Sequence, residues 1–310
     1  MSHRRAVALM LLVTLLWSTA GVVTRQLEAA RSFELTFWRS AFNALALCVL
    51  LPLLRGRGHW RATGRALRAS PVLWASGLCW AVMYTAFMVA LTLTGVANVL
   101  VTMALGPLLT ALFARLLLGH RLPARTWCAI VLASAGIAWM FGHELGAGPG
   151  AWSGMLVALA VPLAAASNWT LLQAQRSRAT PGAAADASDA PPTDLMPAVW
   201  LGALLSAALT LPLAWPFSAS VHDLLLLAGL GVFQLALPCV LVVRLAQVLP
   251  AAELALLGLM EVVLGVLWAW LLAGEAPSPA TLSGGVMVLA ALVGNELLGA
   301  RWRPRNQLET

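Results

Sequence analysis

Two ionisable residues lie inside long apolar stretches, where a charge needs an explanation. Glu261 is the eleventh residue of the apolar stretch 251–272, and Arg39 is the fifth residue of the stretch 35–54. A carboxylate at the centre of a bilayer costs about 2.5–3.5 kcal/mol, so Glu261 must face a cavity, be protonated or have a polar partner. A hydrogen bond between helices and contact with a ligand both remain open for it. Arg39 can extend its guanidinium to the membrane surface or contact a carboxylate, on Glu261 or on a ligand.

Aromatic and polar residues in the middle of other apolar stretches could line a cavity for an amphipathic ligand. Tyr84 is the only tyrosine, and its hydroxyl needs a partner when buried. Trp80 lies one turn earlier on the same helix face, although ordinary packing also explains such a stripe. Gln234 precedes Pro238 by one turn, which predicts a bent helix whose freed carbonyl lines the cavity. The remaining candidates share positions at mid-stretch or at the cavity edge: Trp17, Asn43, Asn98 and Trp169.

Motifs of soluble enzymes are absent from the sequence, which contains no HExxH, GxSxG or P-loop pattern. The four cysteines lie within apolar stretches and have no CxxC spacing, so neither a zinc site nor a disulfide framework is indicated. The histidines are scattered at loop edges rather than clustered: His3, His59, His120, His143 and His222. We therefore expect no enzyme, no cofactor and no metal site.

The composition is that of a polytopic membrane protein. Hydrophobic residues make up 61% of the 310 residues and charged residues 10%, and the mean hydropathy is +0.86. A soluble domain is about 45–50% apolar and about 25% charged. The formal net charge is +7, but all 19 basic residues are arginine and most lie in short segments between apolar stretches. This placement points to membrane orientation, and we expect no nucleic-acid partner.

Ten apolar stretches have about the 20 residues that a helix needs to cross a bilayer. They are 6–24, 35–54, 72–93, 96–118, 124–141, 152–173, 197–216, 222–244, 251–272 and 279–300. If the N-terminus is cytoplasmic, the inner segments hold 15 arginines and the outer loops hold only Arg25 and Arg31. Basic residues favour the cytoplasmic side, so we predict that both termini are cytoplasmic.

A hydrophilic stretch at 174–196, rich in Ala, Pro, Asp and Ser, is predicted to be a flexible cytoplasmic linker. We take 1–173 as an N-terminal five-helix repeat and 197–310 as the remaining helices. The C-terminal repeat is expected to run over 152–300, including the sixth helix.

The two halves resemble each other at a constant offset. Residues 95–127 align without a gap to residues 250–282, an offset of 155, with identical pairs such as Gly119 and Gly274. With an odd number of helices per repeat, the second repeat enters the membrane from the opposite side. We therefore predict an all-α fold of ten transmembrane helices, arranged as two inverted five-helix repeats around a central cavity, as in secondary transporters.

At this point the sequence resembles the EamA-type ten-helix branch of the drug/metabolite transporter superfamily, over nearly the whole chain. The resemblance rests on the order and spacing of Trp17-Ser18 and Arg25, Arg39-Ser40-Ala41, the segment from Pro107 to Gly119, and Glu261-Val262 followed by Gly274-Glu275. Two positions depart from the family pattern: Val262 replaces a proline, and His120 replaces an acidic residue.

The resemblance implies a secondary transporter that exports small amphipathic metabolites across a bacterial inner membrane by alternating access. Neutral or aromatic amino acids are the substrates it favours, and we expect facilitated transport without obligatory proton coupling. A multidrug, organic-cation or nucleotide-sugar transporter of the same superfamily is the alternative, and an intramembrane enzyme is a more distant one. The partners expected are the small-molecule substrate and the lipid bilayer. We expect a monomer, while small residues in the fifth and tenth helices leave a dimer open.

Overall fold

The computed structural model describes all residues except 25, 31, 57, 95, 120–121, 143–150, 180–192, 274–277 and 302–310. The described residues form helices and contain no strand. The helices in chain order are α1 His3–Ser18, α2 Ala20–Thr24, α3 Ser32–Arg55, α4 His59–Ala69, α5 Pro71–Leu93, α6 Val96–Met103, α7 Gly106–Leu118, α8 Ala124–Phe141, α9 Ala151–Ala179, α10 Met196–Ala214, α11 Val221–Gly229, the π-helix η2 Leu230–Ala236, α12 Leu237–Leu245, α13 Ala251–Gly258, α14 Met260–Ala273 and α15 Pro279–Arg301.

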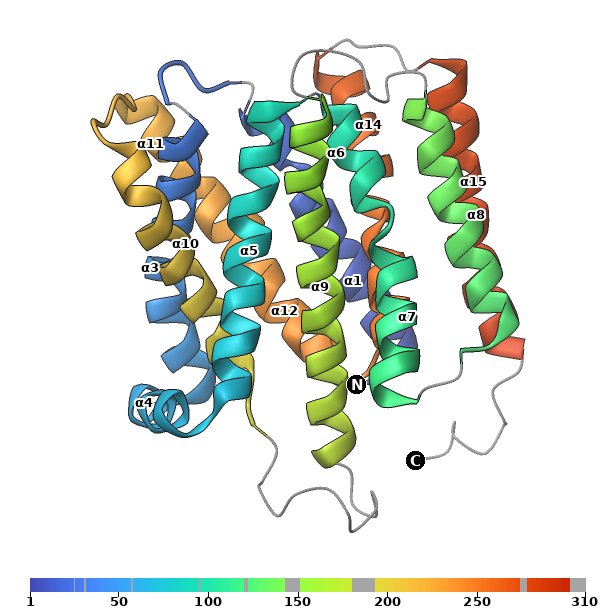
Figure 1. The fold of residues 1–310 in the computed structure, drawn as a ribbon, viewed down its shortest axis with the longest axis horizontal. Helices are drawn as coiled ribbons and strands as arrows, with labels where there is room; N and C mark the ends of the chain where they lie inside the picture. Colours follow the sequence, from blue (N-terminus) through green and yellow to red (C-terminus); the bar gives the residue numbers. More distant parts are fainter. Residues whose placement is uncertain are drawn as a thin grey trace.

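The membrane-crossing segments agree with the ten apolar stretches. Within the described residues, eight helical spans are long and apolar enough to cross a membrane, and Ala124–Met140 and Pro279–Asn295 are two shorter apolar helices. Several crossings consist of two or three consecutive helices: α1 with α2, α6 with α7, α11 with η2 and α12, and α13 with α14. Helix α1 begins and α15 ends at the same end of the bundle (Figure 1), as an even number of crossings requires.

Local signals in the sequence fix several helix ends. Ser70 accepts a hydrogen bond from the Leu73 N–H and is followed by Pro71 at the first position of α5, a combination that favours a helix start. Helix α7 ends at Gly119, whose φ of 66° lies in the left-handed region that glycine adopts without a steric penalty.

The packing of the helices repeats between the two halves. Three crossings pack against their own counterparts: α3 against α10, α7 against α13, and α8 against α15. Other contacts occur in related pairs, since α5 packs on α9 as α12 packs on α1, and α7 packs on α9 as α14 packs on α1. This pattern is the one expected for two inverted repeats.

Breaks in two crossings follow the same symmetry. The fourth crossing is interrupted between Met103 and Gly106, and the ninth between Gly258 and Met260. Adding the sequence offset of 155 to Met103 gives Gly258, so both crossings break at the same place in the repeat. The offset found in the sequence therefore also relates the two irregular positions.

The predicted linker does not divide the ten crossings into two sets of five. Helix α9 continues to Ala179, beyond the expected end at residue 173, and residues 180–192 lie outside the described part. Because α9 is the sixth crossing, six crossings precede this segment and four follow it. The repeat boundaries themselves remain a prediction.

Close helix contacts hold the bundle together at glycines. A Cβ on Gly202 of α10 would lie 2.3 Å from the Cβ of Trp80, so glycine is needed for α10 to approach α5 there. Gly136 of α8 and Gly284 of α15 meet in the same way, because a Cβ on Gly284 would lie 2.4 Å from the Gly136 carbonyl oxygen. Gly136 and Gly284 thus serve packing within one chain, and a dimer remains untested.

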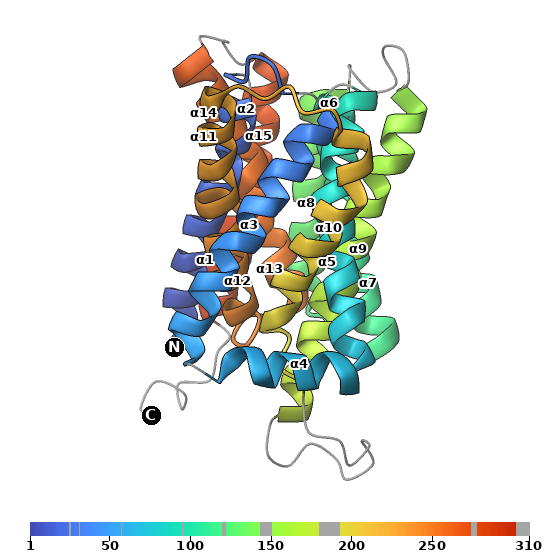
Figure 2. The same cartoon turned by 90° about the vertical axis from the view of Figure 1, so that its left-hand side faces the viewer.

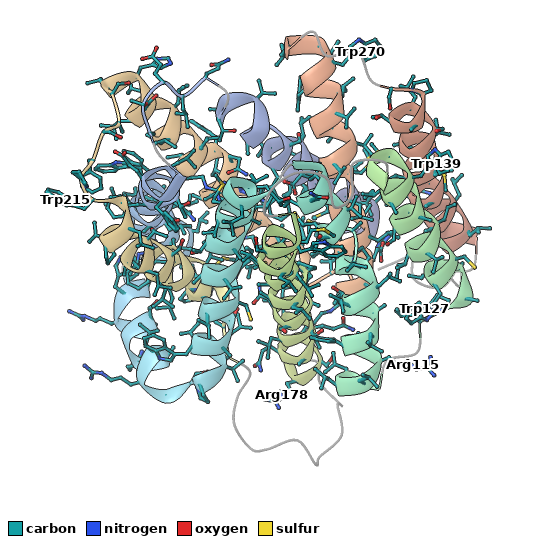
Figure 3. The ribbon with its side chains drawn as sticks, turned by 45° about the horizontal axis from the view of Figure 1, so that its top comes forward. Arg115, Trp127, Trp139, Arg178, Trp215 and Trp270 are labelled. Atoms are coloured by element: carbon teal, nitrogen blue, oxygen red, sulfur yellow. The ribbon has the colours of Figure 1, made fainter. Side chains whose placement is uncertain are left out.

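Exposed and partly buried tryptophans lie toward the ends of the bundle, where an amphipathic ring is favourable. Trp139 and Trp270 lie toward one end, and Trp127 lies toward the end that carries Arg115 (Figure 3). The chain is a multi-pass membrane protein.

Candidate substrate cavity

A cavity of about 170 Å³ lies among the crossings that contain broken helices. An engineered protein cavity of about 150 Å³ holds a benzene molecule, so this space fits one small ligand. Its described lining residues come from α1, α3, α5, α6, α7, α9, η2, α12, α13 and α14. Seven of the nine residues predicted from the sequence line it: Trp17, Arg39, Trp80, Tyr84, Trp169, Gln234 and Glu261.

Irregular helices bring several of these side chains into the cavity. Pro238 follows η2 by two residues and lacks the N–H that a regular helix would use. Gln234 lies within η2, and its Nε2 donates to the Trp17 carbonyl oxygen at 3.4 Å. The bend predicted from Gln234 and Pro238 is therefore a π-helix, a feature often found at functional sites.

The paired breaks of the fourth and ninth crossings open onto the same space. Gly106 and Thr110 of α7 and Gly258 and Glu261 beside the second break all line the cavity. At the first break, the Ala104 carbonyl oxygen accepts a hydrogen bond from the Ser134 hydroxyl at 2.8 Å. Interrupted helices with polar groups at the repeat interface are typical of substrate sites in transporters.

The two charged residues of the cavity face it without pairing. Arg39 is 2% exposed, which excludes the alternative that it extends to the membrane surface. Its Nη2 donates to the Tyr84 carbonyl oxygen at 3.5 Å, and its Nε has no hydrogen-bond partner among the described residues. Glu261 lies near enough to attract Arg39 electrostatically. Among pairs in which both residues are described, the close contacts of opposite charge type lie elsewhere, between His3 and Glu253 and between Arg55 and Asp194.

Three indole and phenol rings form one wall. Trp80 lies with its ring centroid 5.6 Å from that of Tyr84 and 5.5 Å from that of Trp169, the latter in a T-shaped arrangement. A 2.6 Å hydrogen bond from Ser76 to Asn168 ties α5 to α9 close to these rings. Aromatic pairs of this geometry contribute about 0.5–1.5 kcal/mol beyond their buried area, so the wall is held in place before any ligand binds.

Polar atoms on this wall lack partners. Among the described residues, Trp80 Nε1, the Tyr84 hydroxyl and Gln234 Oε1 are buried without a hydrogen bond of full geometry. The Cys239 thiol and the Asn43 amide lie close to the Tyr84 hydroxyl. An unsatisfied buried polar group costs about 1–3 kcal/mol. A ligand or water that supplies partners would recover this free energy.

Two predicted residues do not line the cavity. Asn43 is fully buried beside the contact between α3 and η2, where a Cβ on Gly231 would lie 2.8 Å from the Asn43 backbone nitrogen. Asn98 donates to the Thr94 hydroxyl at 2.8 Å, so its amide is satisfied one turn earlier in the chain. Neither residue is among those that line this cavity, because polarity at mid-crossing does not determine which way a side chain points, and a role for them in substrate binding stays a prediction.

Other lining residues were missed. Met10, Met103, Thr110 and Cys239 all line the cavity. Thr110 lies one turn after the break at Gly106, and its hydroxyl donates to the Gly106 carbonyl oxygen at 2.8 Å. The Gly106-Pro107 pair in the sequence was a signal for an interrupted helix there. The two methionines carried no such signal, since methionine is common in packed cores.

Comparison with known proteins identifies relatives of this fold. Residues 4–142 match the EamA-like transporter family. An uncharacterized transporter of Pseudomonas aeruginosa, PA0485, is 29% identical over 156 residues, which are 50% of this chain and 51% of that protein. The chain thus matches about half the length of this curated relative. One solved crystal structure is 22% identical in sequence to this chain and superposes on it with a TM-score of 0.73. The match covers 98% of this chain and 100% of the other, and it concerns the fold alone.

Proposed function

We propose that this membrane protein, whose residues 4–142 match the EamA-like transporter family, is a secondary transporter of small zwitterionic metabolites. Its favoured substrates are amino acids with apolar or aromatic side chains. The protein exports them across a bacterial inner membrane by alternating access of the central cavity, with both termini in the cytoplasm.

One observation carries the choice of substrate: Arg39 and Glu261 share a small cavity and do not pair with each other. A guanidinium presents a fork of donors that matches a carboxylate, so Arg39 binds the substrate carboxylate. Glu261 accepts hydrogen bonds from the substrate ammonium group. The apolar side chain then lies against Trp80 and Trp169. The two protein charges and the two substrate charges cancel.

The alternative substrates fit this cavity less well. An organic cation would gain from Glu261 and from the aromatic rings, but Arg39 would repel it. A nucleotide sugar carries two phosphates and a large polar body. The described lining contains a single arginine and no other cationic residue, and the space is about 170 Å³. Both observations favour a smaller ligand with one anionic group.

The proposed orientation rests on the arginines in the segments between crossings. In the sequence, the segments assigned to the cytoplasmic side hold fifteen arginines and those assigned to the other side hold two, and basic segments favour the cytoplasm. The direction of net transport is then set by the substrate gradient, which in a producing cell favours export.

The experiment is substrate exchange in proteoliposomes with three matched compounds. Phenylalanine carries both charges, phenethylamine lacks the carboxylate, and 3-phenylpropionate lacks the ammonium group. Losing one charged hydrogen-bonded contact costs about 1.5–3 kcal/mol, so each analogue should compete at least about tenfold more weakly than phenylalanine. Phenethylamine competing as well as phenylalanine would instead favour the organic-cation alternative. Empty liposomes and a panel of small polar amino acids serve as controls.

A further inference from the structure

Helix α4, His59–Ala69, is not one of the membrane crossings. Figure 2 shows it lying across the end of the bundle, roughly perpendicular to the crossings and at the end where α1 begins. One face of α4 packs on the protein: His59 and Thr63 are buried, and the ring of Trp60 lies 4.8 Å from that of Trp200 on α10. The opposite face is open.

The open face of α4 carries a stripe of arginines. Arg61, Arg65 and Arg68 are exposed and are spaced four and three residues apart, which places them on one side of the helix. At 1.5 Å per residue the stripe is about 10 Å long. Helix α4 contains no acidic residue. No described acidic side chain forms an ion pair with these arginines, and nearby Asp194 is occupied by Arg55.

A tryptophan beside α4 indicates that this helix lies near the membrane–water interface. The Trp74 indole donates from Nε1 to the Leu67 carbonyl oxygen at 2.8 Å, which joins the end of α4 to α5. Trp74 is 47% exposed, and exposed tryptophans at helix ends mark the membrane–water interface. A helix with a packed face and a basic face at this level has the features of an interfacial helix that attracts anionic lipids.

We propose that Arg61, Arg65 and Arg68 form a binding site for the phosphate groups of anionic phospholipids in the adjacent leaflet. Guanidinium groups bind phosphate through paired, charge-assisted hydrogen bonds. Phospholipid phosphates are concentrated at the membrane–water interface, where the exposed Trp74 indicates that this helix lies, whereas a free anion must be bound from dilute solution. The site is separate from the cavity and does not depend on which substrate is transported.

The test measures binding of fluorescent phosphatidylglycerol to the purified full-length protein in neutral detergent, with fluorescent phosphatidylcholine as the reference lipid. The variant Arg61→Gln/Arg65→Gln/Arg68→Gln removes the charge of the stripe. Each arginine near a membrane surface contributes roughly a fivefold increase in anionic-lipid affinity, so the triple variant should bind phosphatidylglycerol at least about tenfold more weakly. Binding of phosphatidylcholine should not change.

Two further variants separate the stripe from general charge. Arg115→Gln/Arg178→Gln/Arg244→Gln removes the same charge from exposed arginines outside α4, two of which are labelled in Figure 3, and should bind phosphatidylglycerol like the wild type. The triple Arg→Lys variant of the stripe keeps the charge and should retain most of the binding.

Either of two results would overturn the proposal. One is phosphatidylglycerol binding that falls equally in the stripe variant and in the control. The other is unchanged phosphatidylglycerol binding in the stripe variant together with loss of a dimer, measured by native mass spectrometry. The stripe would then be a contact between two copies of the protein.

Discussion

Glu34 and Asp223 each hold the loop that precedes the other's helix. Glu34, in the first turn of α3, accepts hydrogen bonds of 2.8–3.0 Å from the Ser218 and Ala219 N–H groups and the Ser218 hydroxyl, just before α11. Asp223, in the first turn of α11, accepts from the N–H groups of residues 28, 29 and 30, before α3, at 2.8, 3.0 and 3.0 Å. Both carboxylates also face the positive end of a helix dipole. This reciprocal arrangement locks two loops that are far apart in sequence.

Replacing Asp223 with Asn should destabilise the protein. The change removes the charge and turns an amide N–H₂ toward backbone donors, and hydrogen bonds to charged groups contribute about 1.5–3 kcal/mol each. We expect a loss of about 2–4 kcal/mol, measured by thermal unfolding in detergent. Asp194→Asn is the matched control, because the side chains of the Arg55–Asp194 pair are 36% and 46% exposed, such pairs contribute about 0–1 kcal/mol, and Asn keeps an acceptor for the Met196 N–H. An equal loss of thermal stability in Asp223→Asn and Asp194→Asn would contradict a stabilising role for the hydrogen bonds of Asp223.

The sequence predicted the crossings well because membrane insertion depends on the length and hydropathy of each stretch. It could not predict the reciprocal hydrogen bonds of Glu34 and Asp223, since their partners are backbone N–H groups nearly two hundred residues away. Helix α4 was also not predicted, because its arginines were interpreted only as a topology signal.

The lining of the cavity shows which residue positions the sequence predicts and which it does not. Arg39 and Glu261 were found because a charge within an apolar crossing needs a polar environment, and the cavity supplies it. Asn98 was assigned to the same cavity because it is a polar residue within an apolar crossing, yet its partner Thr94 lies four residues away. The direction of a side chain depends on local partners that hydropathy does not record.

Trp80→Ala should reduce transport by at least about tenfold. The indole forms the centre of the aromatic wall and is 2% exposed. Truncating a buried tryptophan typically costs about 3–5 kcal/mol of folding stability, so the wall loses its shape. Exchange in proteoliposomes at matched protein content measures the effect. Tyr84→Phe removes one hydroxyl from the same wall and keeps the ring. A raised KM in this second variant would show that the wall contributes to substrate binding and not only to folding. Trp152→Ala, which truncates an indole that is 74% exposed, should transport normally.

Acidification should loosen α4 through His59. Burial lowers the pKa of His59, repulsion from Arg55 lowers the pKa further, and Asp194 partly opposes both. Between this lowered value and the ordinary pKa of about 6.5, the unfolded segment binds more protons than the docked one. Docking is therefore most stable above about pH 6.5 and weakens as the pH falls through the lowered pKa.

Hydrogen exchange of the α4 amides, corrected for intrinsic rates, tests this between about pH 7.5 and about pH 5.5. Exchange should increase on acidification in the wild type. In His59→Gln, which retains a hydrogen-bonding group near the Thr63 hydroxyl but does not titrate, the pH dependence should disappear. The same dependence in both proteins would assign it to another group.

Glu261 should shape substrate binding without acting as an obligatory proton carrier. It is the acidic residue among the described lining residues. The other acidic residue of this crossing, Glu253, lies in the first turn of α13, and its Oε1 is 2.9 Å from His3 Nε2. Among the described lining residues there is therefore no second carboxylate at mid-depth through which a proton could be relayed. Glu261→Gln keeps the shape and one hydrogen-bond acceptor for the substrate ammonium group while removing ionisation.

We expect Glu261→Gln to raise the KM about tenfold, since a charged contact becomes a neutral one, and to retain flux at saturating substrate. Glu261→Leu should perform worse, because it also removes the acceptor. Flux of a neutral amino acid, measured in proteoliposomes with and without an imposed pH difference, should be indifferent to that difference in the wild type and in Glu261→Gln. Uphill accumulation driven by a proton gradient in the wild type, lost in Glu261→Gln, would instead make Glu261 the coupling site.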